Sequence, residues 1–320
     1  MNKKKQFIEH HQISIYLISL ILATIVGLTI PKSAHFLENI ISVLLVFLMF
    51  IMFSQLPFFQ KNSPIISMKF ILGLILSNFI FIPIFVYILV HIFQISHPGI
   101  LIGVYLVLLA PCIDYVIVFT AMGKGNAQYM AMVTPILLLL QIVLLPVYLT
   151  LFLQHMNIPT IELLPFIQTF IIYIIIPFTL AIFLQSMSQN SKIAKTTLKA
   201  TTWLPELFMA LVLFSVVGSQ IHNVISNVSL VYMVIPLYII YLIIAPIIGY
   251  FSGKLLSLET TSIRTLSFST STRNALVVLP ITFALPDKIA AISAIVIVTQ
   301  TLIELLGELI YIKLIPKFIR

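Results

Sequence analysis

Long apolar runs separated by short polar stretches fill this 320-residue chain almost from end to end. A bilayer core about 30 Å thick requires around 20 mostly apolar residues for each helical crossing. We therefore predict an all-α polytopic membrane protein with about ten transmembrane helices. The predicted spans are Ile13–Ile30, Ile40–Leu56, Phe70–Phe93, Ile100–Met122, Met130–Leu153, Phe166–Gln185, Trp203–Ile221, Val228–Phe251, Ile263–Leu285 and Ile289–Ile315.

Composition leaves no room for a separate soluble domain. Hydrophobic residues make up 61% of the chain and charged residues only 8%, whereas soluble domains have roughly 25% charged residues. We therefore treat residues 1–320 as a single integral membrane transporter domain in contact with the lipid bilayer. The net charge of +8 comes from basic residues dispersed at the ends of apolar runs, which argues against a nucleic-acid partner.

The distribution of Lys and Arg predicts the orientation. Basic residues accumulate in short cytoplasmic loops, and with ten spans and a cytoplasmic N-terminus only Lys32 and Lys288 fall outside. We therefore predict a multi-pass protein of the cell (inner) membrane with both termini in the cytoplasm. The predicted cytoplasmic residues are Lys3, Lys4, Lys5, Lys61, Lys69, Lys124, Lys192, Lys195, Lys199, Lys254, Arg264, Lys313, Lys317 and Arg320.

The two halves of the chain have matching interruptions. Five spans per half would make residues 13–153 and 166–315 inverted repeats, because an odd number of crossings reverses the direction of entry. The fourth span is interrupted at Ala110–Asp114, and the ninth is interrupted at Ser269–Asn274. Paired broken helices in corresponding positions are typical of a transporter's binding site, so we predict the solute site at these two breaks.

Asp114, Arg273 and Asn274 are the candidate solute-binding residues in these breaks. An ionised carboxylate at mid-membrane costs at least about 2.5–3.5 kcal/mol unless it is paired, hydrated or protonated. Asp114 is therefore also a candidate for binding the coupling ion. The structural alternative is that Asp114 pairs with Arg273 only to hold the two breaks together.

Gln300, Glu304 and Glu308 form one stripe on the tenth span, because residues four apart share a helix face. We predict that Glu304 binds the solute and that all three contribute to coupling-ion binding. Glu304 lies deeper in the span and is the better candidate for proton binding and release. Glu308 approaches the cytoplasmic end, where it would alternatively be an interfacial anchor.

Cys112 is the only cysteine and lies two residues from Asp114. A lone cysteine is usually a small buried hydrophobe, but its soft sulfur at a break would suit a soft solute such as trivalent arsenic. The sequence has no nucleotide-binding glycine loop, HExxH motif or serine-nucleophile elbow. We therefore predict no cofactor, no structural metal and no enzymatic activity, with an intramembrane enzyme or a passive channel as lesser alternatives.

The segments Leu109–Val116 and Ser269–Asn274, together with Lys124–Asn126 and Thr299–Glu304, resemble the bile acid:sodium symporter superfamily. Within it, the likeness is closest to arsenical resistance permeases. The resemblance implies ten helices in a panel domain and a core domain, in which helices 4 and 9 cross at their breaks. In arsenite permeases a span 4 cysteine and a span 10 glutamate are the functional pair, and these match Cys112 and Glu304.

The chain also departs from those patterns. Pro111 stands where arsenite permeases tend to have arginine, and Leu306 stands where they have proline, while Asp114 replaces a small residue. Sodium-coupled members have Glu and Gln where this chain has Ser269 and Arg273. A fixed positive charge should repel sodium, so we expect coupling to protons through Asp114 or Glu304.

Two transport hypotheses follow from these residues. The first is an arsenite efflux permease that exchanges a trivalent arsenic species for protons by alternating access, with Cys112 as the arsenic ligand. The second keeps the fold but makes the solute an organic anion, transported by sodium- or proton-coupled symport and paired with Arg273. Replacement of Cys112 by Ser should damage only the first activity severely.

Overall fold

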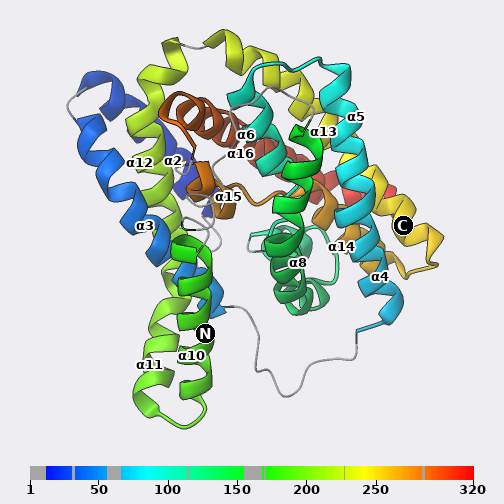
Figure 1. The fold of residues 1–320 in the computed structure, drawn as a ribbon. Coiled ribbons are helices and arrows are strands. Elements are labelled where there is room, and N and C mark those ends of the chain that lie inside the picture. The colour runs from blue at the N-terminus through cyan, green and yellow to red at the C-terminus, as the bar shows by residue number, and fades with distance from the viewer. Residues whose placement is uncertain are drawn as a thin grey trace. The chain divides into compact units, whose positions relative to one another are not determined.

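The computed structural model of this chain describes residues 12–30, 33–55, 66–113, 115–154, 168, 171–226, 228–282 and 285–320. Helices make up 87% of it, and the described residues include no β-strand. The predicted all-α class is therefore confirmed. The chain divides into two compact units, each assembled from segments of both halves of the sequence (Figure 1).

Each predicted span overlaps a helix or a pair of helices. Six helical stretches in the described residues are long and apolar enough to cross a membrane, and three shorter apolar helices accompany them. The fourth and ninth spans are each two short helices, because their breaks interrupt them. The protein is therefore a multi-pass membrane protein, while the ten-helix count and the inverted repeats remain predictions.

The first unit contains α2 (Gln12–Thr29), α3 (Ser33–Gln55), η2 (Ile171–Ile175), α10 (Ile176–Ser188), α11 (Lys192–Ala200), η3 (Thr201–Trp203) and α12 (Pro205–Ser226). Here α12 packs on α2 and α3, and α10 packs on α3. A Cβ atom on Gly27 would lie 2.5 Å from the Gly218 carbonyl oxygen. Small residues thus let α2 and α12 approach closely, as is common between membrane helices.

The second unit contains the remaining elements: α4 (Met68–Leu76), η1 (Ser77–Phe81), α5 (Ile82–Ile92), α6 (Pro98–Leu108), α7 (Val116–Met122), α8 (Ala127–Leu153), α13 (Val228–Leu255), α14 (Thr260–Ser271), α15 (Ala275–Thr282) and α16 (Asp287–Phe318). The most extensive packing in this unit joins α16 to α6. Gly103 allows this approach, since a Cβ atom there would lie 2.9 Å from the Ser293 carbonyl oxygen.

A π-helical turn, η1, joins α4 to α5 and contains the buried residue Asn78. Pro83 follows this turn, and a proline in a helix leaves the carbonyl four residues earlier without its usual partner. The Tyr148 hydroxyl donates a hydrogen bond to that carbonyl, on Phe79, over 2.5 Å. Single π turns often lie at functional sites, and this one brings an uncharged polar side chain into the core of the second unit.

Arg264 ties three segments of the second unit together. Its Nε and Nη2 donate to the Ile319 carbonyl over 3.0 and 2.8 Å, and its Nη1 donates to the Lys124 carbonyl over 3.1 Å. The end of α16, the start of α14 and the turn after α7 therefore meet at one end of this unit. Arg264 and Lys124, both predicted to be cytoplasmic, lie together there.

Candidate functional site

The breaks between α6 and α7 and between α14 and α15 pair with each other. The Asn274 amide donates to the Ala110 carbonyl over 2.8 Å, and the Cys112 amide donates to the Thr272 carbonyl over 3.1 Å. Pro111 and Arg273 form an isolated antiparallel bridge between these bonds. Extended backbone inside a bilayer must satisfy its polar groups within the protein, and here each break supplies partners for the other.

Most of the predicted site residues lie in or beside this bridge. Cys112, Arg273 and Asn274 belong to the paired segments, and Glu304 accepts a hydrogen bond from the Arg273 amide over 2.9 Å. Gln300, on the turn of α16 before Glu304, donates to the same carboxyl group. All of these side chains are buried, whereas Asp114 lies outside the described residues.

Glu304 also contacts a residue that sequence reasoning missed, Tyr115. The Tyr115 hydroxyl oxygen lies 2.8 Å from Glu304 Oε1 and 2.9 Å from the Arg273 carbonyl oxygen. A phenol has a single proton to donate, and a backbone carbonyl can only accept. Both contacts are hydrogen bonds when Glu304 is protonated, because it then donates to Tyr115 and Tyr115 donates to Arg273.

Glu308 has a similar environment one turn further along α16. Its Oε1 lies 2.7 Å from the Thr272 hydroxyl oxygen, which lies 2.6 Å from the Phe268 carbonyl oxygen. The single proton of Thr272 again faces two acceptors unless the carboxyl group itself donates. Glu308 is completely buried, and its Oε2 has no hydrogen-bond partner in the described part of the chain.

The Arg273 guanidinium group is completely buried and faces uncharged oxygens. Its Nη2 lies 2.7 Å from the carbonyl oxygens of Ser269 and Thr270 and 2.8 Å from Asn78 Oδ1. Its Nη1 is 3.5 Å from the Leu108 carbonyl oxygen. The Tyr241 ring lies 5.9 Å from the guanidinium carbon, a distance suited to a cation–π contact.

Asn274 has a structural role that its sequence position did not reveal. Its Oδ1 accepts from the Val277 amide over 3.1 Å and so caps α15. Its Nδ2 is buried and has no hydrogen-bond partner among the described residues, and the same is true of Arg273 Nε. Both nitrogens are therefore buried donors without a partner in the part of the breaks that the structure describes.

Tyr115, Thr272 and Asn78 are the polar residues that sequence reasoning did not select. Thr272 lies inside the second break and Tyr115 follows Asp114, so both positions were noted without a role. The Ser77–Asn78 pair interrupts an otherwise apolar stretch, and this was the one signal that pointed to Asn78. No group of three or more His, Cys, Asp or Glu side chains in the described ranges is arranged to hold a metal ion.

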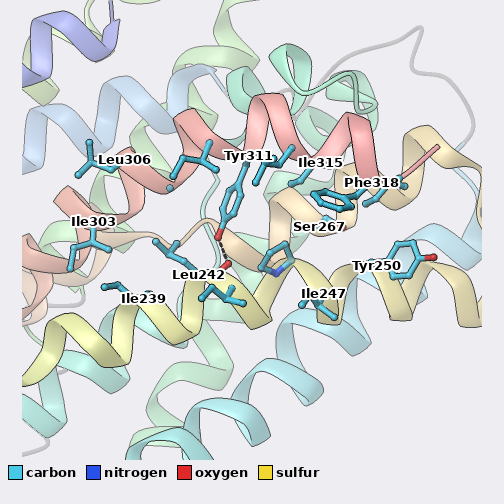
Figure 2. Close-up of a pocket in the computed structure, with 16 residues that line it drawn as sticks. Ile239, Leu242, Ile247, Tyr250, Ser267, Ile303, Leu306, Tyr311, Ile315 and Phe318 are labelled. Carbon is cyan, nitrogen blue, oxygen red and sulfur yellow. Dashed lines mark hydrogen bonds between the residues drawn. The ribbon is translucent and has the colours of Figure 1, made fainter.

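An apolar groove of the second unit is lined by other residues than these (Figure 2). It has a volume of about 860 Å³ and runs between α13 and α16, with Ser267 of α14 contributing to its wall. Figure 2 shows Tyr311 reaching across it toward the Leu242 carbonyl, to which its hydroxyl donates. Leu306, Ile310 and Ile243 are exposed along it. This apolar lining suits lipid chains, and it includes none of the predicted site residues.

A multi-pass membrane protein in which two broken helices pair around buried polar side chains has the features of a secondary transporter. The chain matches the model of the Sodium Bile acid symporter family over residues 42–245 and belongs to that family. Members of this family are transporters rather than enzymes. A comparison with curated proteins found no match.

The family match ends before Arg273 and Glu304, so it does not cover the second break or α16. The closer likeness to arsenical resistance permeases remains a prediction, as does the choice of coupling ion. The family's description supports a small solute with sodium as coupling ion. The residues beyond the match therefore decide whether this chain follows that pattern.

Proposed function

We propose that this chain is a proton-coupled secondary transporter of the cell membrane, in which Glu304 binds the coupling proton beside the paired breaks. The observation behind the proposal is the position of its carboxyl group, which accepts from the Arg273 amide and contacts the Tyr115 hydroxyl. One carboxyl group thus touches the second break and the start of α7. A proton there also lowers the cost of moving a carboxylate through apolar surroundings.

The number of available hydrogens supports a proton at this position. Tyr115 and Thr272 each lie between a carboxyl oxygen and a backbone carbonyl, and each has one hydrogen to donate. Protonated Glu304 and Glu308 satisfy all four contacts, whereas two carboxylates would leave an acceptor facing an acceptor at each hydroxyl. Release of these protons would require other partners, which links protonation to a change of conformation.

Trivalent arsenic is the solute that we propose first, with efflux in exchange for protons. Cys112 is the only thiol of the chain and is buried in the first break, where its amide is bonded to Thr272. A thiolate sulfur is a soft ligand and suits a soft metalloid. Glu304 contacts the same bridge, because it accepts a hydrogen bond from the Arg273 amide. Solute and proton would therefore compete for a common region.

Organic-anion transport is the second candidate. Arg273 Nε and Asn274 Nδ2 are buried donors without partners in the described structure, and an anionic group would satisfy both. The family's description also favours it. Against it, Nη2 already faces three protein oxygens and Nη1 faces one, so Nε is the only guanidinium nitrogen without a partner in the described structure.

Arsenite uptake into everted membrane vesicles, with and without a proton gradient, tests the first candidate. We expect gradient-driven uptake by the intact protein and its loss, by at least about tenfold, in Cys112→Ser and Glu304→Gln. Glu259→Gln is the matched control, because Glu259 is exposed and its side chain accepts hydrogen bonds from its neighbours Thr261 and Ser262.

Uptake by Cys112→Ser equal to that of the intact protein would remove arsenite as the solute. Uptake of a radiolabelled bile acid by the same vesicles, abolished by Arg273→Gln and unchanged by Cys112→Ser, would instead establish the second candidate. Because Cys112 is the only cysteine, any effect of a thiol reagent on transport is traced to one position.

A further inference from the structure

Arg273 Nη2 lies in a cage with more oxygens than it can bond as a donor. Three oxygens lie 2.7–2.8 Å away, from Asn78, Ser269 and Thr270. A guanidinium Nη has only two hydrogens. Convergence of neutral oxygens on one positively charged centre is the arrangement by which proteins hold a bare cation.

Contacts other than those to the arginine support part of the cage. The carbonyls of Ser269 and Thr270 are at the C-terminal end of α14, where the helix dipole is negative. Half-helix ends of this kind coordinate monovalent cations in membrane transporters. Tyr241 donates to the Thr270 carbonyl over 2.8 Å, so this wall of the cage has a second support from α13.

Asn78 is held with its oxygen toward the cage. Its Nδ2 donates to the Leu74 carbonyl over 3.2 Å and to the Ser269 hydroxyl over 3.0 Å. A carbonyl can only accept, so the amide group facing Leu74 must be the NH₂ and Oδ1 must face Arg273. The amide orientation therefore adds a third oxygen with a preset direction.

No carboxylate among the described residues neutralises the guanidinium group through an ion pair. Arg273, Asn78, Ser269 and Thr270 are all completely buried, and burial of an unpaired charge is costly. The compensation comes from the oxygens, the end of α14 and the Tyr241 ring. These are the interactions that a small inorganic cation would receive at the same point.

We infer that the Arg273 guanidinium group is a covalently tethered substitute for a monovalent inorganic cation in this oxygen cage. Sodium or potassium ions are excluded in the intact protein because the cage is permanently occupied. Removal of the side chain uncovers a cation site formed by Asn78, Ser269 and Thr270. This inference deepens the proposed proton coupling, since an occupied cage leaves no place there for a cotransported cation, but its test requires no transport.

The test is thermal unfolding of the purified protein in detergent, in NaCl, KCl or choline chloride at constant ionic strength. We expect the intact protein to unfold at the same temperature in all three salts. Arg273→Ala should unfold at a lower temperature in choline and recover by about 3 °C or more, saturably, in sodium or potassium. The two salts distinguish which cation fits the cage better.

Asn78→Leu in the Arg273→Ala background is the matched control. It removes one oxygen of the cage and should abolish the recovery. Equal stability of Arg273→Ala in all three salts would overturn the inference, and so would an equal response of the intact protein and Arg273→Ala to sodium or potassium.

A second comparison applies if Arg273→Ala does not fold. Arg273→Lys keeps a tethered cation and Arg273→Met keeps a long side chain without charge. The inference requires Lys to be the more stable of the two in choline, with a smaller response to sodium or potassium than Met. Greater stability of Met in choline would contradict it. Failure of arsenite or proton transport would leave these results unchanged, so the two proposals fail separately.

Discussion

Two hydroxyl groups determine which hydrogen bonds, and therefore which protonation states, the two buried glutamates of α16 can have. Tyr115 and Thr272 each contact a carboxyl group and a backbone carbonyl, and both come from the paired breaks rather than from α16. The protonation of α16 is therefore connected to the geometry of the breaks at two adjacent turns. Through these hydroxyl contacts, solute binding at the breaks and proton binding on α16 would influence each other.

Infrared spectroscopy should detect the proton on Glu304 directly. At neutral pH we expect a carbonyl stretching band of a protonated carboxyl group, part of which disappears in Glu304→Gln. Tyr115→Phe should shift that part to higher frequency, because Glu304 loses the oxygen to which it donates. Tyr232→Phe, which changes an exposed tyrosine, should leave the spectrum unchanged.

A spectrum that contains only carboxylate bands for Glu304 would contradict this assignment. Loss of the band in Glu304→Gln without any response to Tyr115→Phe would retain the proton but reject Tyr115 as its partner. The same measurement on Thr272→Val examines Glu308 by the same reasoning, since valine keeps the shape of threonine and removes its hydroxyl.

At the scale of elements, close helix packing holds the broken helix in place. Gly249 of α13 faces the last turns of α14, where a Cβ atom would lie 2.5 Å from Thr270 Oγ1 and 2.7 Å from the Leu266 carbonyl oxygen. Backbone atoms cannot move aside as a flexible side chain does. The position of the cage carbonyls on α14 therefore depends on a glycine in a neighbouring helix.

Gly249→Ala should destabilise the second unit by about 1–3 kcal/mol through overpacking. Thermal unfolding in detergent measures the change, and Ile243→Ala, at an exposed position on the same helix, is the control. A melting temperature of Gly249→Ala equal to that of Ile243→Ala would show that α13 and α14 can separate without loss. In that case α13 would not fix the position of the break.

The sequence predicted the elements better than their contacts. Each apolar run of membrane length coincides with at least one helix, and the polar interruptions at 110–114 and 269–274 predicted the two breaks, whereas the polar helix α11 was not predicted. The pairing of Asn78 with Arg273 could not be predicted in this way, because it joins residues 195 positions apart. The direction of the guanidinium group depends on helix ends that only the folded chain brings together.

At the scale of the whole molecule, the orientation in the membrane rests on charge alone. Basic residues of α11, Lys192, Lys195 and Lys199, belong to the predicted cytoplasmic side, and only Lys32 and Lys288 to the outer side. This assignment stays a prediction. The positive-inside rule gives it a physical basis, since basic loops are retained in the cytoplasm.

Cysteine labelling can test the orientation without interference from other thiols. In a Cys112→Ser background, Lys195→Cys should react with a membrane-impermeant maleimide only in everted vesicles. Lys32→Cys should react only in intact spheroplasts. Reaction of both variants from the same side would contradict the predicted number of crossings between them, and the reverse pattern would place both termini outside.

The Arg264 contacts have a practical consequence for reporters attached to this protein. Two nitrogens of its side chain bind the carbonyl of Ile319, which follows α16, and a third binds the turn after α7. A fluorescent domain fused directly after Arg320 would pull on a backbone group that also anchors α14. A fusion at the N-terminus avoids disturbing this contact. A C-terminal fusion should include a flexible spacer so that the Ile319 carbonyl keeps its hydrogen bonds to Arg264.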